Sequence, residues 1–301
     1  MKVIITGATG FIGAALLRPL RATSHSLVLL SRNPRRPESG STEEWLHWEP
    51  GTGGVWEHAV DGADGIINLA GEPIAAKRWT PVQKERIRSS RIDTTKALVH
   101  AIAKAKVKPK FMISSSAVGY YGPRGDETLT EESLPGNDFL SRLCVEWEEE
   151  ALKAEGQGVR VALLRTGIVL GKGKGALAKM VPPFKMFFGG RLGSGKQWMP
   201  WIHIDDEVGL IQFLMENENA RGAFNATAPN PVTMSEFSRA LGKVLNRPSW
   251  APVPASVLTL VLGEMADMLL AGQRALPGAA ERLGFRFRYT NVVNALASLE
   301  L

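Results

Sequence analysis

Three glycines spaced three residues apart stand near the start of the chain, and they constrain its fold more than any other feature. Gly7, Gly10 and Gly13 follow the β-forming run Lys2–Thr6 and open a helical pattern that continues through Leu20. In a strand–turn–helix unit, one such glycine makes the tight turn, another lets the backbone approach a pyrophosphate, and the last lets the helix pack closely. The N-terminus of the helix then faces the anion. The pattern predicts a Rossmann-type dinucleotide-binding unit.

The end of the second expected strand favours NADP over NAD. Sites that prefer NAD usually carry an acid there, about 20 residues after the glycines, to hold the ribose hydroxyls. This strand ends instead at Ser31 and Arg32. An arginine beside a hydroxyl suits the 2′-phosphate of NADP. Arg35 and Arg36 follow, and we expect them to be solvated surface charges.

Small residues end the third expected strand, at 65–71, and let its backbone lie close to the adenosine and ribose. Two arginines on the helix after it are further candidates for cofactor contacts, although a surface charge explains each of them equally well. The expected cofactor-binding residues are Gly7, Thr9, Gly10, Phe11, Ile12, Gly13, Ser31, Arg32, Asn68, Leu69, Ala70, Gly71, Arg86 and Arg91.

Short runs rich in Val and Ile alternate with longer helical patterns, which is typical of a doubly wound α/β fold with a parallel sheet. Helices are expected at about 80–105, capped by Thr80, and at about 138–155. After residue 171 the alternation weakens. We therefore expect a Rossmann domain over 1–171, a smaller substrate lobe over 172–250 with room for elements that return to the sheet, and a helical appendage over 251–301. The expected strands are 2–6, 26–31, 65–69, 110–114 and 160–164.

Charge and composition limit the partners of the chain. The formal charge is +6, and residues 172–204 contain six Lys or Arg and no acid, interspersed with aromatic residues. Such a segment suits an anionic small molecule, or equally a solvated basic loop. Neither nucleic acid nor a membrane is expected as a partner, since no basic stacking platform is visible and the apolar stretch 253–270 carries charges. We expect that stretch to form a buried or capping helix.

The single cysteine, Cys144, excludes an internal disulfide and a multi-cysteine zinc site, and no metal is expected. We expect it to be a small residue on a helix face. The chain starts directly on a strand-like run, without the charged and apolar regions of a secretion signal, so we expect a cytoplasmic protein.

Several stretches carry recognisable motifs, namely Asn68-Leu-Ala-Gly71, Ser89-Ser-Arg-Ile92, Ser114-Ser-Ser-Ala-Val-Gly-Tyr-Tyr-Gly122, Leu164-Arg-Thr-Gly-Ile-Val-Leu-Gly171, Trp201-Ile-His-Ile-Asp-Asp206 and the tail from Pro252. With the Thr-Gly-x-x-Gly-x-x-Gly opening, they resemble the extended and atypical short-chain dehydrogenase/reductases. More narrowly, the chain resembles the epimerase-like subgroup of unknown substrate that carries an extra C-terminal domain. The resemblance spans nearly the whole chain, and it implies a Rossmann fold and an NAD(P) cofactor.

The resemblance also implies a catalytic serine, while the usual proton donor of the superfamily is missing. Members carry a Ser or Thr after the fourth strand, which orients the substrate, and Ser116 matches it. They also carry a Tyr-x-x-x-Lys pair on the next helix, but none of the three tyrosines here has Lys four residues later. Asp138 and Arg142 occupy the two positions. Arg142 can hold the ribose, but its pKa stays too high for a proton relay.

Four side chains are therefore candidates for the proton donor. Tyr120 and Tyr121 follow Ser116, although stacking or a surface hydrogen bond also explains them. Asp138 also suits a helix cap. His203 titrates in a useful range, although a histidine beside apolar residues is commonly structural. The candidate catalytic residues are thus Ser116, Tyr120, Tyr121, Asp138 and His203.

Two functions fit these residues. The first is an NADP-dependent oxidoreductase or epimerase that acts on a small, anionic or sugar-nucleotide-like hydroxyl or carbonyl compound. The second is a non-catalytic NADP-binding redox sensor or assembly factor, which the absence of the Tyr-x-x-x-Lys pair keeps open. The substrate and the oligomeric state do not follow from the sequence.

Overall fold

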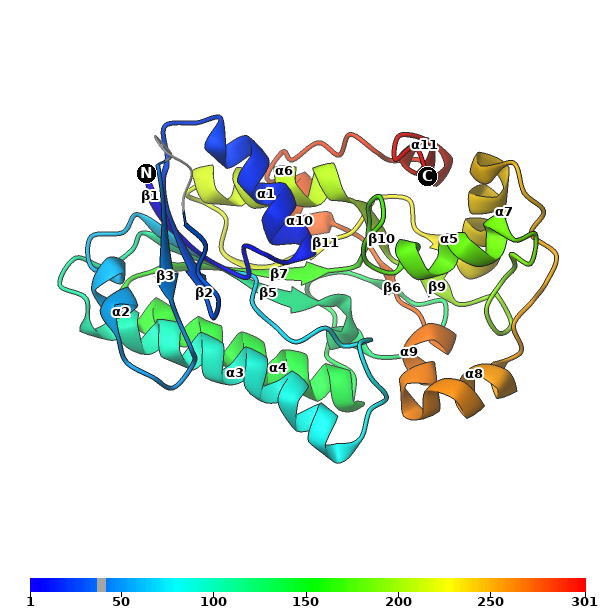
Figure 1. The fold of residues 1–301 in the computed structure, drawn as a ribbon, viewed down its shortest axis with the longest axis horizontal. Coiled ribbons are helices and arrows are strands. Elements are labelled where there is room, and N and C mark those ends of the chain that lie inside the picture. Colours follow the sequence, from blue (N-terminus) through cyan, green and yellow to red (C-terminus); the bar gives the residue numbers. More distant parts are fainter. Residues whose placement is uncertain (37–41) are drawn as a thin grey trace.

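The computed structural model describes residues 1–36 and 42–301. Within these residues the centre of the molecule is a parallel sheet of seven strands, in the order β11-β7-β5-β4-β1-β2-β3 (Figure 1). The order reverses between β1 and β4, which is the switch point at which doubly wound sheets bind dinucleotides. The strands are β1 (Lys2–Thr6), β2 (Ser26–Ser31), β3 (Glu43–His47), β4 (Gly65–Asn68), β5 (Phe111–Ala117), β7 (Arg160–Thr166) and β11 (Gly222–Ala226).

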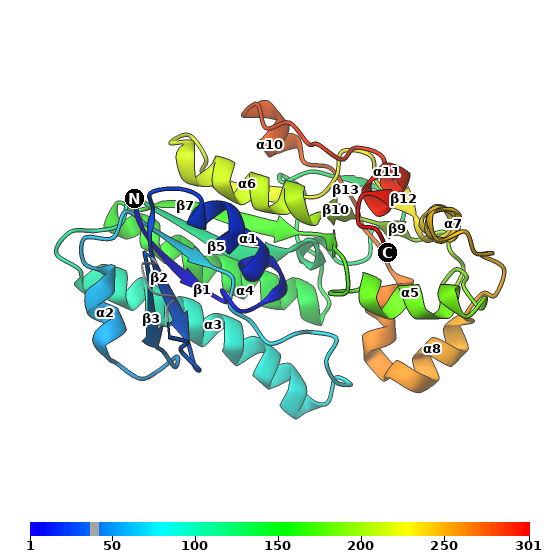
Figure 2. The ribbon, with the colours of Figure 1, turned by 45° about the horizontal axis from the view of Figure 1, so that its top comes forward.

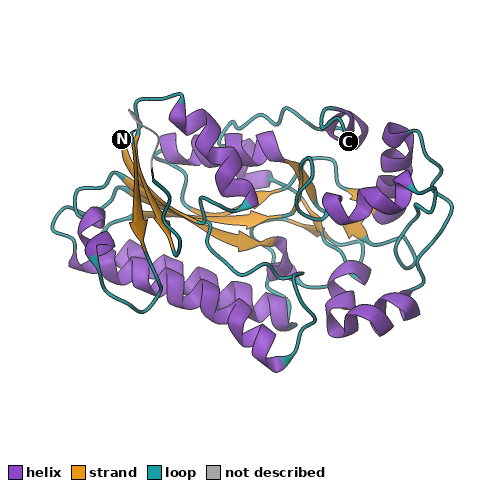
Figure 3. Cartoon of the chain, in the orientation of Figure 1, coloured by secondary structure: helices purple, strands orange, loops and turns teal. Residues whose placement is uncertain are grey.

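Helices cover both faces of the sheet, as Figure 3 shows. The apolar strands are buried on both faces because each face packs against a separate hydrophobic cluster. One face carries α1 (Phe11–Arg21) and α6 (Ile204–Glu216). The other carries α2 (Val55–Val60), α3 (Pro81–Lys104) and α4 (Phe139–Leu152).

The doubly wound α/β fold predicted from the sequence is confirmed, and so are its main elements. Thr80 caps α3 by accepting a hydrogen bond from the backbone of Gln83, and Pro81 begins the helix. The fourth and fifth predicted strands extend further than expected, to Ala117 and Thr166. Strands β3 and β11 were not expected. Strand β11 returns from the segment after residue 171 to pair with β7 at the edge of the sheet.

A smaller layer of structure lies beyond the carboxyl end of the sheet and encloses a third hydrophobic cluster. In Figure 2 its helices α5, α7 and α8 lie at the opposite end of the molecule from β2 and β3. The pair β8–β10 joins this layer to the sheet, and β13 pairs with β6. Its elements and the C-terminal ones are β6 (Thr128–Leu129), β8 (Ile168–Leu170), α5 (Leu177–Lys185), β9 (Trp198–Met199), β10 (Trp201–His203), β12 (Val232–Thr233), α7 (Met234–Leu245), α8 (Ala255–Leu262), α9 (Asp267–Leu270), β13 (Arg274–Ala275), α10 (Gly278–Arg282) and α11 (Val292–Ala297).

The apolar stretch 253–270 is not one buried helix, so that alternative of the prediction is wrong. Gly263, with φ of +62°, follows the end of α8, and a 3₁₀ turn separates α8 from α9. Leu258 is the buried residue of α8, whereas Leu260 is 79% exposed. Because the 3₁₀ turn after Gly263 interrupts the helical path, only short helical segments of this stretch contact the core. Across the described residues, every helix is too short or too polar to cross a membrane.

Candidate functional site

The glycine-rich turn joins β1 to α1 at the switch point of the sheet. Gly7 has φ of +69°, and a Cβ atom there would lie 2.6 Å from the carbonyl carbon of Leu69. A Cβ atom on Gly13 would lie 2.3 Å from the carbonyl oxygen of Gly7. The Gly10 amide donates to that same oxygen at 2.9 Å, and Gly10, at the N-cap position before α1, offers no side chain to cap the helix. The first amides of α1 are therefore left for an anion.

A buried hydrogen-bond network holds the turn against the end of β4. The Thr6 hydroxyl donates to Asn68 Oδ1 at 2.7 Å and accepts from the amides of Leu69 and Ala70 at 3.2 Å each. Asn68 Nδ2 in turn donates to Thr95 Oγ1 at 3.0 Å. The Asn68 side chain therefore links the ends of β1 and β4 to α3 through hydrogen bonds. The backbone of Leu69 and Ala70 faces Gly7.

The end of β2 lies beside this turn. Thr6 is in register with Leu30, so Ser31 and Arg32 follow at the level of the glycines. Ser31 is half-buried, and its hydroxyl accepts from the amide of Asn33 at 3.2 Å. Arg32 is exposed. Residues 31–36, at the end of β2, thus present a hydroxyl and a guanidinium group, and they contain no acid.

The other three candidate arginines differ in their surroundings. Arg91 is internal: its Nη1 donates to the carbonyls of Glu72 and Ile87 at 3.0 Å each, and its guanidinium lies 5.2 Å from the Trp147 ring centroid. Burial lowers its pKa. Arg91 therefore braces the loop after β4. Arg86 is exposed on α3, and Arg142 is exposed on α4, where it donates to the carbonyl of Asn137.

Ser116 is part of a buried polar network at the end of β5. Its hydroxyl donates to Glu148 Oε1 on α4 at 2.5 Å. Arg165 on β7 binds the same carboxylate with two hydrogen bonds, from Nε to Oε1 and from Nη2 to Oε2, each 2.8 Å long. The Arg165 and Glu148 side chains are only 5% and 6% exposed. Burial acts to lower the pKa of Arg165, but the hydrogen bonds and charge of Glu148 outweigh it and raise that pKa.

The two tyrosines after Ser116 lie on this network in different ways. Tyr121 is buried, donates to Asn225 Oδ1 at 2.7 Å and accepts from Arg165 at 3.0 Å. Burial raises the pKa of Tyr121 to about 12, so its phenol stays protonated. Tyr120 is half-buried, and the Arg165 guanidinium lies 3.5 Å from its ring centroid. The Tyr120 hydroxyl has no hydrogen-bond partner within residues 1–36 and 42–301.

Asp138 and His203 are both N-cap residues of helices, α4 and α6. Asp138 caps α4, accepting from the Ser141 amide at 2.7 Å and the Ser141 hydroxyl at 2.9 Å. His203 is 2% exposed, and its Nδ1 accepts from the Asp205 amide at 3.1 Å. Its Nε2 lies 3.2 Å from the Ser298 hydroxyl, and its ring lies 3.8 Å from the Tyr289 ring centroid. Burial lowers the pKa of His203, which favours the neutral ring. Both side chains thus have hydrogen-bond partners within the chain.

Buried acids near the strand ends were missed by sequence reasoning. Glu207 on α6 accepts from Thr166 Oγ1 at 2.9 Å, while its second carboxylate oxygen is buried without a partner in the described chain. Burial raises the pKa of Glu207 to about 8. Glu148 is another such acid. Arg165 was the one available signal, since it lies within the recognised stretch 164–171.

The sheet order, the glycine turn at its switch point and the serine at the end of β5 together define a protein of the short-chain dehydrogenase/reductase class. Sequence comparison gives the particular family. The family model described as the NAD dependent epimerase/dehydratase family matches residues 3–226, and a domain of unknown function matches residues 253–299. The chain belongs to the NAD dependent epimerase/dehydratase family, which confirms the resemblance seen in the sequence.

Relatives of the chain match it over its full length. The chloroplastic epimerase family protein SDR39U1 homolog of Arabidopsis thaliana is 45% identical, over 99% of this chain and 86% of that protein. The crystal structure of human epimerase family protein SDR39U1 with NADPH superposes with a TM-score of 0.89 at 34% identity, covering 99% of each chain. The nucleoside-diphosphate sugar epimerase of Corynebacterium glutamicum gives a TM-score of 0.80 at 36% identity, covering 99% of this chain and 57% of that one.

Proposed function

We propose that the chain binds NADP(H) along the glycine turn and acts as an oxidoreductase or epimerase on a small hydroxyl or carbonyl compound. The observation that carries the cofactor assignment is the pair Ser31 and Arg32, which stands beside the turn where an NAD site would carry an acid. The space that Cβ atoms would fill at Gly7 and Gly13 fits the close approach of a pyrophosphate. The human relative crystallised with NADPH supports the same choice.

The substrate is proposed to lie between the Rossmann domain, 1–171, and the lobe formed by 172–250. Two contacts join the start of this lobe to the cofactor turn and to the loop after β4. The Phe11 ring lies 2.4 Å from the position that a Cβ atom on Gly171 would take, and Lys179 donates to the carbonyl of Ala75 at 2.9 Å. The basic residues of 172–204 other than Arg191 suit an anionic or sugar-nucleotide-like compound. A relative named a nucleoside-diphosphate sugar epimerase supports that class.

Tyr120 is the proposed proton donor, and Ser116 the proposed orienting hydroxyl. A donor needs a hydroxyl free to reach the substrate. The hydroxyl of Tyr121 is held by Asn225 and Arg165, and Asp138 and His203 are held at helix ends. The bound cofactor would supply the hydride, while Glu148 and Arg165 fix the positions of Ser116 and Tyr120.

The test is turnover of NADPH or NADP with a panel of sugar nucleotides and simple carbonyl and hydroxyl compounds. For a compound that reacts, Tyr120→Phe is expected to lower kcat by roughly 10²–10⁴-fold and to leave the Kd of NADPH unchanged. Ser116→Ala is expected to lower kcat less. Tyr289→Phe is the matched control, and we expect its kcat to equal that of the wild type.

Two outcomes would contradict the catalytic part of this proposal. If Tyr120→Phe and Ser116→Ala both keep the wild-type kcat, the reacting groups lie elsewhere. If NADPH binds and no compound of the panel reacts, the non-catalytic alternative, a redox sensor or assembly factor, replaces the enzyme.

A further inference from the structure

A small cavity lies in the layer beyond the sheet, away from the glycine turn. Two extended segments form one side of it, because Val253 donates to the carbonyl of Arg191 at 2.9 Å and accepts from Gly193 at 2.8 Å. Helix α7 forms the other side. The volume of the cavity is about 110 Å³. Figure 1 places α7 at the opposite end of the molecule from β1 to β3.

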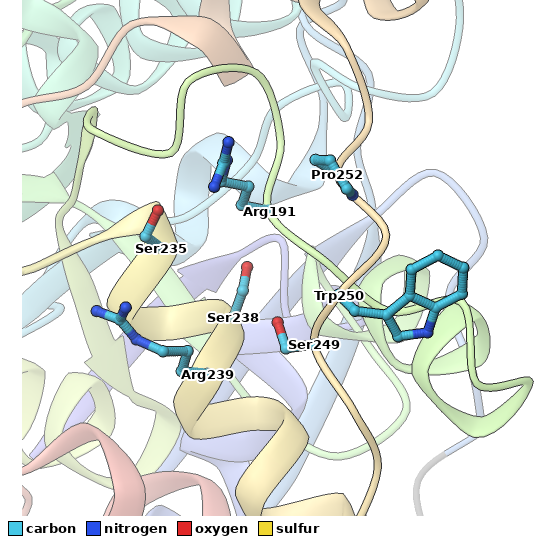
Figure 4. A pocket seen from close by; sticks show the side chains of 7 residues that line it. All are labelled: Arg191, Ser235, Ser238, Arg239, Ser249, Trp250 and Pro252. Atoms are coloured by element: carbon cyan, nitrogen blue, oxygen red, sulfur yellow. The ribbon is translucent and has the colours of Figure 1, made fainter.

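Polar and basic side chains line this cavity. Figure 4 shows these side chains, which come from α7 and from two loops. Two of them are arginines from different elements, and three are serines. The lining residues are Arg191, Ser235, Ser238, Arg239, Ser249, Trp250 and Pro252.

No acid lines the cavity, and neither of its arginines has a salt bridge within the part of the chain that the structure describes. The nearest acid on α7 is Glu236, whose carboxylate accepts from the amide and the hydroxyl of Thr233 at 2.7 and 2.8 Å. The hydrogen bond from the Thr233 backbone is the main cause that lowers the pKa of Glu236, and the charge of Arg239 contributes least. Two exposed arginines therefore line the cavity, and no carboxylate lines it with them.

The backbone around the cavity brings its hydroxyls close to the arginines. A Cβ atom on Gly195, where φ is +73°, would lie 2.1 Å from Ser235 Oγ and 2.5 Å from Arg191 Cδ, so these two side chains meet over that glycine. Ser238 is only 1% exposed, yet its hydroxyl has only long contacts, 3.4 Å to the carbonyl of Gly190 and 3.8 Å to the sulfur of Met234. Ser238 therefore lines the cavity with a buried hydroxyl whose two hydrogen-bond partners both lie at long distance.

We infer that this cavity is a second anion site, built for a phosphate group such as that of a phosphomonoester or of free phosphate. Guanidinium groups pair with phosphate oxygens through charge-assisted, two-pronged hydrogen bonds. The serine hydroxyls would donate to the remaining oxygens, and the volume suits one phosphate group better than a whole nucleotide. The site is separate from the proposed NADP site, so a phosphorylated metabolite would bind there while the cofactor is bound.

The test is calorimetric titration of the full chain with inorganic phosphate and with ribose 5-phosphate. Arg191→Ala and Arg239→Ala are each expected to weaken binding about tenfold or more, since a hydrogen bond to a charged group contributes about 1.5–3 kcal/mol. Arg286→Ala removes an exposed arginine elsewhere and is the matched control. Arg32→Ala removes the arginine of the proposed cofactor site and distinguishes a phosphate bound at that site from one bound in the cavity.

A comparison of the two titrations identifies the ligand source: tighter binding of ribose 5-phosphate indicates a phosphomonoester, and equal binding indicates the phosphate group alone. Binding that Arg32→Ala abolishes and Arg191→Ala leaves intact would overturn the inference, because the anion would then sit in the cofactor site. Absence of binding of either probe at millimolar concentration would overturn it as well. Thermal unfolding of each variant checks that the fold is kept.

Discussion

The buried pair Glu148–Arg165 offers the sharpest test of how the candidate active site is held together. Glu148→Ala removes the acceptor of two Arg165 hydrogen bonds and of the Ser116 hydroxyl, all between 2.5 and 2.8 Å. It leaves a guanidinium that is about 5% exposed without its counter-charge. Removing one partner of a buried pair costs about 3–5 kcal/mol, so we expect a loss of that size in the free energy of unfolding.

The assay is urea unfolding at pH 7 of the wild type, Glu148→Ala, Arg165→Met and the double variant. Replacing both charges leaves neither one unpaired, so we expect the double variant to be more stable than the sum of the single losses implies, by about 2–3 kcal/mol. Glu149→Ala, at the exposed neighbour on α4, is the matched control and should change stability by less than about 0.5 kcal/mol. A loss below about 1 kcal/mol for Glu148→Ala, or additive single effects, would refute the reasoning.

Two further predictions concern the turn and the buried acid. Gly7→Ala should cost more than the roughly 1–2 kcal/mol of the left-handed conformation and should abolish NADPH binding, because its Cβ atom would meet the Leu69 backbone at 2.6 Å. Gly62→Ala, also at positive φ but with open space around it, should show the conformational cost alone in urea unfolding; equal losses would contradict this. Burial raises the pKa of Glu207 from 4.5 to about 8, so the folded chain keeps a proton that the unfolded chain loses between these values. Wild-type stability should therefore fall by up to about 1.4 kcal/mol per pH unit as the pH rises from 4.5 to 8, and Glu207→Gln should lose this slope; an unchanged slope would contradict the assignment.

Local patterns predicted the parts of the fold that depend on neighbouring residues. The glycine turn, the strands rich in Val and Ile, and the Thr80 cap each need only a few consecutive residues, and each is found where the sequence indicated. Strands β3 and β11 were missed for a physical reason. Strand β3 is an edge strand of sequence Glu-Glu-Trp-Leu-His, and β11 reads Gly-Ala-Phe-Asn-Ala, so neither has a run of β-branched residues.

The polar network of the candidate active site could not be predicted, because it depends on pairing between distant elements. Glu148 stands in a run of three glutamates on a helix, which in sequence indicates a solvated face. It is buried only because β7 carries Arg165 to the same place, 17 residues later in the chain. Asn225 comes from a strand that the sequence did not reveal, and it holds Tyr121. Because Asn225 is far from Tyr121 in the chain, the sequence did not show that the Tyr121 hydroxyl is bonded while the Tyr120 hydroxyl, among the described residues, is not.

The central claim is that Ser31 and Arg32 select NADP at the glycine turn, and calorimetry of the wild-type chain with NADPH and with NADH tests it most directly. Arg32 is exposed at the end of β2, in register with the turn, so its charge is available to the 2′-phosphate. We predict that NADPH binds at least about tenfold more tightly than NADH, since a hydrogen bond to a charged group contributes about 1.5–3 kcal/mol. Arg32→Glu should reverse the preference. Equal affinities of the wild type for the two cofactors would contradict the account.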